Sequence, residues 1–128
     1  MPLFLKNYLP AFVWAFFIFF LSMMPGKYVA PANIWDLANF DKLGHMFVFL
    51  VLMLLSLRGF SKQIHAAPAF RFILTMFLIC SVYGFLLEVM QGTVSTDRQF
   101  DLVDSVANML GCLLGGVLFK YVRAITLR

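Results

Sequence analysis

The sequence predicts an all-α integral membrane protein, built as a four-transmembrane-helix bundle with its N- and C-termini cytoplasmic. Of its 128 residues, 62% are hydrophobic and only 12% are charged, whereas soluble domains average about 45–50% apolar and about 25% charged residues. The apolar residues fall into four long runs, and runs such as 12–24 offer no polar face that water could solvate. We therefore expect one transmembrane domain over residues 1–128, with helices at roughly 9–24, 41–58, 72–91 and 101–122.

The charged residues divide between the two ends of these helices. All six acidic residues fall at one end: Asp36, Asp41, Glu88, Asp97, Asp101 and Asp104. Seven of the ten basic residues fall at the other end: Lys6, Arg58, Lys62, Arg71, Lys120, Arg123 and Arg128. Because basic excess marks the cytoplasmic side, we expect the acidic end to face outward. The net charge of +4 needs no nucleic-acid partner, since the basic residues flank apolar runs.

The first predicted helix, 9–24, begins beside Pro10, a residue tolerated at a helix start, and ends before Pro25 and Gly26. Its many aromatic side chains indicate a helix that faces lipid over much of its surface. Three further apolar runs follow it, so we interpret it as a retained span and not as a signal peptide. Residues 26–40 carry Tyr28 and Trp35, which favour a membrane interface.

The second predicted helix, 41–58, has a strictly apolar part, 43–57, that is shorter than the roughly 17–25 residues that a crossing needs. The helix must therefore include Asp41 and Lys42, whose charges are costly within a membrane unless they are paired or hydrated. A basic cytoplasmic connection, 58–71, with Gly59 and Pro68, follows this helix.

The third predicted helix, 72–91, ends before Gly92, and the fourth, 101–122, begins with Asp101 as its N-cap. Asp104 then lies at the positive end of the helix dipole. Cys80 and Cys112 lie within these spans, where we expect buried thiols in preference to a disulfide.

Polar residues line up near the acidic ends of the last three helices. On 101–122, two carboxylates, an amide and two glycines share an arc of about 80°. The predicted outward-facing polar pocket comprises Asp41, Lys42, His45, Glu88, Gln91, Arg98, Asp101, Asp104 and Asn108. The glycines expected to allow close helix packing are Gly44, Gly84, Gly111 and Gly115.

Several chemistries fit this set of side chains. His45, Glu88 and Asp104 are candidate ligands of a divalent metal, although no H-E-x-x-H motif is present. The imidazole and the carboxylates could also serve as acid and base, but no nucleophile stands out. As a binding site, Lys42 and Arg98 would hold a phosphate or carboxylate while the acids bind sugar hydroxyls or an amine. The structural alternative is that the polar groups only satisfy one another's hydrogen bonds and charges and fix the packing of the helices.

Four motifs in this order resemble the VanZ-like family, named for a teicoplanin-resistance accessory protein. They are residues 14–22 with Pro25-Gly26, D-K-L-G-H at 41–45, Y-G-F-L-L-E-V-M-Q at 83–91, and R-Q-F-D-L-V-D-S-V-A-N-M-L-G-C-L-L-G at 98–115. The resemblance covers almost the whole chain. It implies a multi-pass protein of the bacterial cytoplasmic (inner) membrane that acts in the cell envelope.

The resemblance supplies no reaction, so whether the chain is an enzyme stays open. Teicoplanin is a lipidated glycopeptide, which implies a lipid-linked or lipidated ligand besides membrane lipids. The expected function is recognition or handling of an anionic or glycosylated lipid, or a lipidated amphiphile, at the outer leaflet. The alternatives are a membrane-embedded, metal-assisted enzyme acting on an envelope lipid, and a structural or partner-binding helix bundle.

Overall fold

The computed structural model describes residues 1–24, 38–94 and 100–126 of the chain and, within these, the side chains of all but 38–41 and 126. The described chain is all-helical. Its four helices are α1 (Leu3–Met23), α3 (Ala38–Ile64), α4 (Phe70–Val94) and α5 (Leu102–Thr126). All four are long and apolar enough to cross a membrane, over stretches of 21, 23, 25 and 24 residues, where about 20 are needed. The prediction of four apolar membrane-length helices is thus confirmed.

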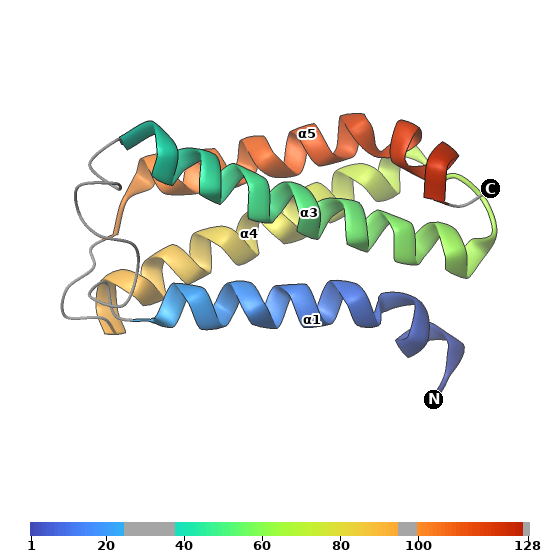
Figure 1. The fold of residues 1–128 in the computed structure, drawn as a ribbon, viewed down its shortest axis with the longest axis horizontal. Coiled ribbons are helices and arrows are strands. Elements are labelled where there is room, and N and C mark those ends of the chain that lie inside the picture. The colour runs from blue at the N-terminus through green and yellow to red at the C-terminus, as the bar shows by residue number, and fades with distance from the viewer. Residues whose placement is uncertain (25–37, 95–99, 127–128) are drawn as a thin grey trace.

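The helices lie side by side along one long axis (Figure 1). The most extensive contact between helices is that of α3 with α5. α1 packs mainly against α3, and α4 packs mainly against α5. The start of α1 and the end of α5 lie at the same end of the bundle as the connection between α3 and α4 (Figure 1). The opposite end therefore brings together the start of α3, the end of α4 and the start of α5.

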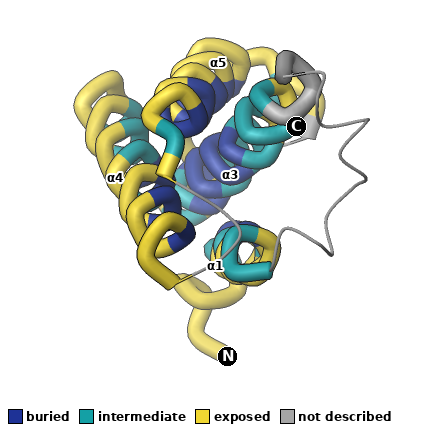
Figure 2. Tube along the Cα trace, turned by 90° about the vertical axis from the view of Figure 1, so that its left-hand side faces the viewer, coloured by how far each residue is buried: buried dark blue, intermediate teal, exposed yellow. Residues whose placement is uncertain are grey.

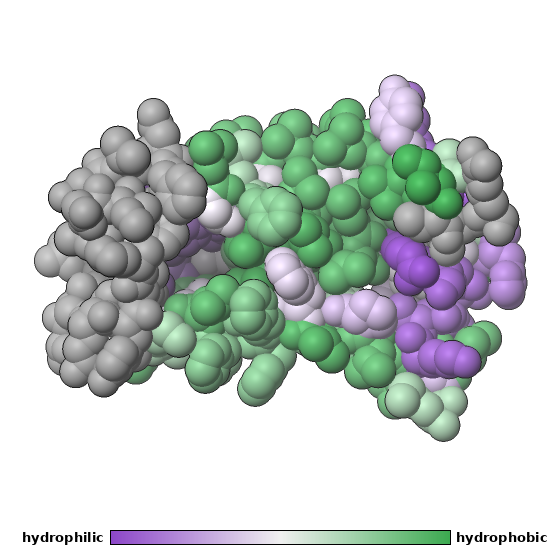
Figure 3. Space-filling view, viewed as in Figure 1, coloured by the Kyte–Doolittle hydropathy of each residue, from purple (hydrophilic) through white to green (hydrophobic). Residues whose placement is uncertain are grey.

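The core of the bundle centres on α3, whose Phe49, Met53 and Leu57 are almost completely buried. Cys80 of α4 and Cys112 of α5 pack into the same core as free thiols, as expected. Buried positions face inward on α3, α4 and α5, whereas the outer faces of the helices are exposed (Figure 2). Apolar side chains cover much of the middle of the bundle, and hydrophilic ones gather at the end that holds the α3–α4 connection (Figure 3). An exposed apolar surface of this extent is expected where lipid replaces water.

The two largest differences from the predicted helix boundaries are at the start of α1 and the end of α3, where contacts between these helices stabilise extra turns. α1 begins at Leu3, so Pro10 lies inside it and not at its start. α3 continues to Ile64 through Gly59, which the sequence placed in the cytoplasmic connection. A Cβ at Gly59 would stand 2.9 Å from the carbonyl oxygen of Asn7. The extra turns of α1 and α3 thus pack against each other, and a glycine permits the approach.

The ends of α3 and α4 show two further features. α4 runs through Gly92, the predicted terminator, to Val94. A Cβ at Gly92 would stand 2.8 Å from the backbone nitrogen of Phe100, so this glycine makes room for the returning chain. α3 is followed by His65, which has a φ of 56° and lies in the left-handed region often used after a helix end.

Candidate functional site

Six side chains from three helices form what we call the polar cluster, at the end of the bundle opposite the α3–α4 connection. They are Lys42, His45, Glu88, Asp101, Asp104 and Asn108. α3 contributes the two basic residues, α4 contributes Glu88, and the start of α5 contributes the rest. Residues from three predicted helices thus come together here, and all of them except Asp101 lie within segments apolar enough to cross a membrane.

The start of α5 fixes two of the carboxylates. Asp101 caps this helix, since its Oδ1 accepts a hydrogen bond of 2.9 Å from the backbone N–H of Val103. Asp104 lies in the first turn, where the helix dipole favours negative charge. Both roles were predicted, and both leave carboxylate oxygens available for partners on α3.

Lys42 joins α3 to both of these carboxylates. Its Nζ donates a hydrogen bond of 2.8 Å to Oδ2 of Asp101 and also bonds Oδ1 of Asp104. The hydrogen bond from Lys42 holds the pKa of the Asp101 carboxyl below its ordinary value. The ammonium of Lys42 is therefore already bound by two carboxylates.

His45 lies one turn deeper on α3 and contacts α5 through both ring nitrogens. Its Nδ1 is 3.0 Å from Oδ1 of Asn108, and its Nε2 is 3.7 Å from Oδ2 of Asp104. An amide oxygen only accepts hydrogen bonds, so Nδ1 must carry the proton that it donates. In the neutral imidazole, Nε2 then holds its lone pair toward the carboxylate of Asp104.

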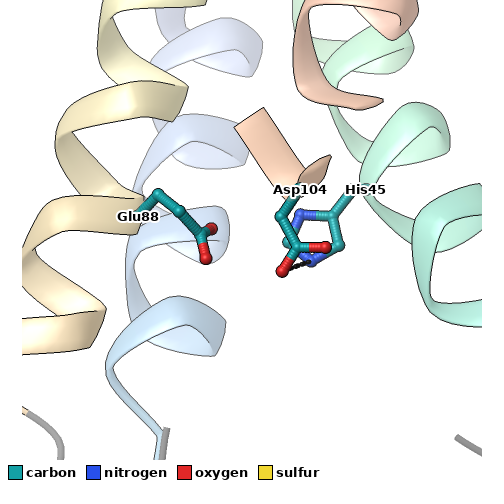
Figure 4. A group of neighbouring side chains, drawn as sticks. All are labelled: His45, Glu88 and Asp104. Atoms are coloured by element: carbon teal, nitrogen blue, oxygen red, sulfur yellow. Dashed lines mark ion pairs between the residues drawn. The ribbon is translucent and has the colours of Figure 1, made fainter. Parts of the chain in front are cut away.

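Glu88 completes the cluster from α4. It is 3% exposed, and its Oε1 accepts one hydrogen bond, of 3.3 Å, from the backbone N–H of Asp101. Figure 4 shows its carboxylate directed toward the side chains of Asp104 and His45. One ligating atom from each of these three residues lies within 4.8 Å of the other two.

The charges of the described cluster do not balance. Three carboxylates face one lysine and one imidazole, so the cluster is net negative, even with His45 protonated, when all three carboxylates are ionised. Two of these carboxylates, those of Glu88 and Asp104, are buried, and buried negative charge is strongly unfavourable at membrane depth unless positive charge or hydrogen-bond donors compensate for it. The cluster can therefore accept a cation, an amine or hydroxyl donors.

Close helix approach positions these groups, as the glycine pattern predicted. A Cβ at Gly84 would meet the side chain of Asn108 at 2.9 Å, so this glycine lets α4 approach α5 beside the cluster. A Cβ at Gly111 would overlap the carbonyl oxygen of Met46, and one at Gly115 would stand 2.8 Å from the Cβ of Met53. Small residues at these points allow α5 to lie against α3.

The packing role expected of Gly44 is wrong for the part of the chain that the structure describes. No described atom outside its own helix lies within 4 Å of the point where its Cβ would stand. Gly44 and Met46 are two residues apart and so lie about 200° apart around α3. Because Met46 faces α5, Gly44 points away from that contact.

The other predicted members of the pocket lie elsewhere or outside the description. Gln91 is buried, but its Nε2 donates a hydrogen bond of 3.0 Å to the carbonyl oxygen of Ser22, which ties α4 to the end of α1. Asp41 lies in α3 as expected, and its side chain falls outside the described residues. Arg98 also falls outside them.

Polar contacts at the other end of the bundle were not foreseen. Asn7 Nδ2 donates a hydrogen bond of 2.8 Å to Oε1 of Gln63, joining α1 to the last turn of α3. Arg123 Nε donates a hydrogen bond of 2.8 Å to Oγ of Ser61, joining α5 to the same region. The polar residues just beyond the apolar runs were the available signal for these ties.

Comparison with known proteins yields one informative relative. An uncharacterized protein of Schizosaccharomyces pombe is 35% identical to this chain over 97 residues. The match covers 76% of the chain but only 57% of the relative, so the chain spans less than two thirds of that protein's length. No protein-family model matches the chain, and no solved structure matches it.

Proposed function

We propose that this chain is a VanZ-like membrane protein of the cell envelope that recognises or handles the polar headgroup of a lipid or lipidated amphiphile at the outer leaflet. The observation that carries the proposal is the polar cluster, a set of buried carboxylates in helices that can cross a membrane. Ionisable groups at such positions are costly and generally mark a functional site. The net negative charge favours hydroxyl or amine donors, and thus a glycosylated or amine-bearing headgroup over an anionic one bound directly.

The proposed location is the bacterial cytoplasmic membrane, with both termini in the cytoplasm. Support comes from the charge pattern, in which acidic residues gather at one end of the helices and basic residues at the other. The relative that the chain matches is from a eukaryote, Schizosaccharomyces pombe. The proposed orientation of the polar cluster therefore rests on the charge asymmetry and not on the kind of organism.

A second candidate function is a membrane-embedded enzyme acting on an envelope lipid. The observation that favours it is the convergence of His45, Glu88 and Asp104 within 4.8 Å of one another. An imidazole beside two carboxylates can exchange protons or ligate a metal that activates water. Turnover of a lipid by the purified chain would distinguish this candidate from binding alone.

The test is binding of a defined amphiphile to the full chain in nanodiscs. We would use teicoplanin and the same glycopeptide without its acyl chain, and compare the wild type with Asp104→Asn and Glu88→Gln. Lys62→Gln, an exposed change at the opposite end, is the matched control. We expect saturable binding of the acylated compound that both cluster variants abolish and the control retains.

Stability must be measured on the same samples. Asp104→Asn keeps the size of the side chain and removes its charge, so the variant should still insert and fold. If both cluster variants bind like the wild type and only their melting temperatures change, the polar cluster is a packing device and the proposal fails.

A further inference from the structure

The geometry of the polar cluster points to a divalent transition-metal site, and we propose that His45 Nε2, Glu88 and Asp104 together bind one Zn²⁺-like ion. The inference goes beyond amphiphile binding and does not depend on it, because it concerns only these three side chains. Each comes from a different helix, and all three point toward one another (Figure 4). Their ligating atoms lie within 4.8 Å of one another.

The first argument is the orientation of His45. Asn108, which is 2% exposed, accepts the Nδ1–H of this imidazole at 3.0 Å. Metal-ligating histidines commonly donate their second ring N–H to such a fixed acceptor, which sets the tautomer and aims the other nitrogen at the metal. Here the aimed nitrogen is Nε2, and it faces the carboxylate of Asp104 at 3.7 Å.

The second argument is the distance between those two groups. At 3.7 Å, Nε2 and Oδ2 are too far apart for a hydrogen bond. Two ligands of one tetrahedral ion, each about 2.0–2.2 Å from it, stand about 3.3–3.6 Å apart. The pair thus already has nearly the separation that a shared cation imposes.

The third argument is Glu88, a buried carboxylate that pairs with no ammonium or guanidinium of the described residues. Among the described residues, its carboxylate accepts a single hydrogen bond, from the backbone N–H of Asp101, and no ammonium or guanidinium contacts it. Lys42 is engaged with the other two carboxylates. A cation between Glu88, Asp104 and His45 would neutralise charge that no described ammonium or guanidinium pairs with at Glu88.

The ligand set selects the class of ion. Imidazole nitrogen favours Zn²⁺ and other transition ions over Mg²⁺ and Ca²⁺, which prefer all-oxygen sites. Three protein ligands leave a fourth position of a tetrahedral ion open to water or to an external oxygen. The site is therefore of the open kind, able to hold a ligand that arrives from the outer end of the bundle.

The test uses the untagged full chain in detergent micelles, stripped of metal with EDTA and titrated with Zn²⁺ and Co²⁺. We expect one ion per chain, with Mg²⁺ and Ca²⁺ competing poorly. His45→Ala, Glu88→Gln and Asp104→Asn should each weaken binding at least about tenfold, an effect that even loss of an outer partner can produce. His65→Ala, which removes the other histidine at the opposite end of the bundle, should leave binding unchanged.

Two further measurements keep the result interpretable if a variant folds poorly. The melting temperature of the wild type should rise with Zn²⁺ concentration, because an ion that binds only the folded state stabilises it. The absorption spectrum of bound Co²⁺ should show nitrogen and oxygen ligation, whereas thiolate bands would move the site to Cys80 and Cys112. The proposal is overturned by thiolate bands, by non-saturable binding, or by retained affinity in the three ligand variants.

Discussion

The imidazole Nδ1 of His45 lies 3.0 Å from the amide oxygen of Asn108, which joins α3 to α5 one turn below the ion pairs of Lys42. Asn108 is buried beside Gly84, where the lack of a side chain on α4 makes room for its amide. One hydrogen bond thus depends on all three helices that form the polar cluster. Removal of this hydrogen bond should lower the stability of the bundle and change the direction in which Nε2 of His45 points.

Asn108→Ala should lower the free energy of unfolding by about 1–3 kcal/mol, because the buried Nδ1–H of His45 loses its acceptor. Thermal melts in detergent would measure this loss. The matched control is Ser105→Ala on the same helix, since the buried Ser105 hydroxyl has no hydrogen-bond partner among the described residues. Removing an unsatisfied hydroxyl should be neutral or stabilising, and equal losses in the two variants would contradict the role given to Asn108.

Gly111→Ala should destabilise the bundle by about 1–3 kcal/mol through overpacking, and Gly111→Leu by more. The added Cβ would overlap the carbonyl oxygen of Met46, a backbone atom that moves only if α3 moves. Gly44→Ala provides the control two residues before Met46, where the described space is open. This change should be neutral or gain up to about 1 kcal/mol of helix propensity. Opposite ranking of the two alanine variants in melts would refute the close approach of α3 and α5.

The sequence predicted the helices well where a long apolar run decides the structure, and poorly where tertiary contacts extend a helix. The first turns of α1 precede Pro10 and give no transmembrane signal, yet Asn7 bonds Gln63 there. The sequence placed Gly59 in the α3–α4 connection. Its close contact with α1 cannot be recognised from a single sequence. Helix ends therefore depend on neighbours that periodicity alone cannot identify.

Helical spacing also explains how much of the polar cluster could be foreseen. It placed Asp101, Asp104 and Asn108 on one face of α5, and these residues do lie together. It could not show which helix each polar residue faces. Gln91 shares the face of Glu88 one turn away but bonds the carbonyl of Ser22, because the end of α1 lies against that part of α4.

Acid should weaken the tie between α3 and α5 that Asp101 makes. Its pKa is lowered by the hydrogen bond from Lys42, so its ionised form is favoured in the folded state. The resulting stabilisation is fully present above the ordinary pKa of an aspartate, near about 4, and is lost as the pH falls through the lowered value. Melting temperatures measured from neutral pH down to pH 3 should therefore decrease as the pH drops below about 4.

Asp101→Asn isolates that contribution, because asparagine retains the N-cap of α5 while it removes the charge. The difference in melting temperature between wild type and Asp101→Asn should shrink as the pH falls below about 4. A difference that stays constant over the whole range would mean that the pairing with Lys42 adds no stability.

The orientation of the bundle can be tested by single-cysteine labelling in a background that lacks Cys80 and Cys112. Thr93→Cys would place an exposed thiol at the end of α4 that lies beside the polar cluster, and Ala67→Cys would place one in the α3–α4 connection. Because the basic residues gather at the connection, position 67 should react only with reagent that reaches the cytoplasm. Position 93 should react with an impermeant reagent added outside intact cells. Labelling of position 93 only from the cytoplasmic side would invert the bundle, turn the polar cluster toward the cytoplasm and remove the outer leaflet as the source of its ligand.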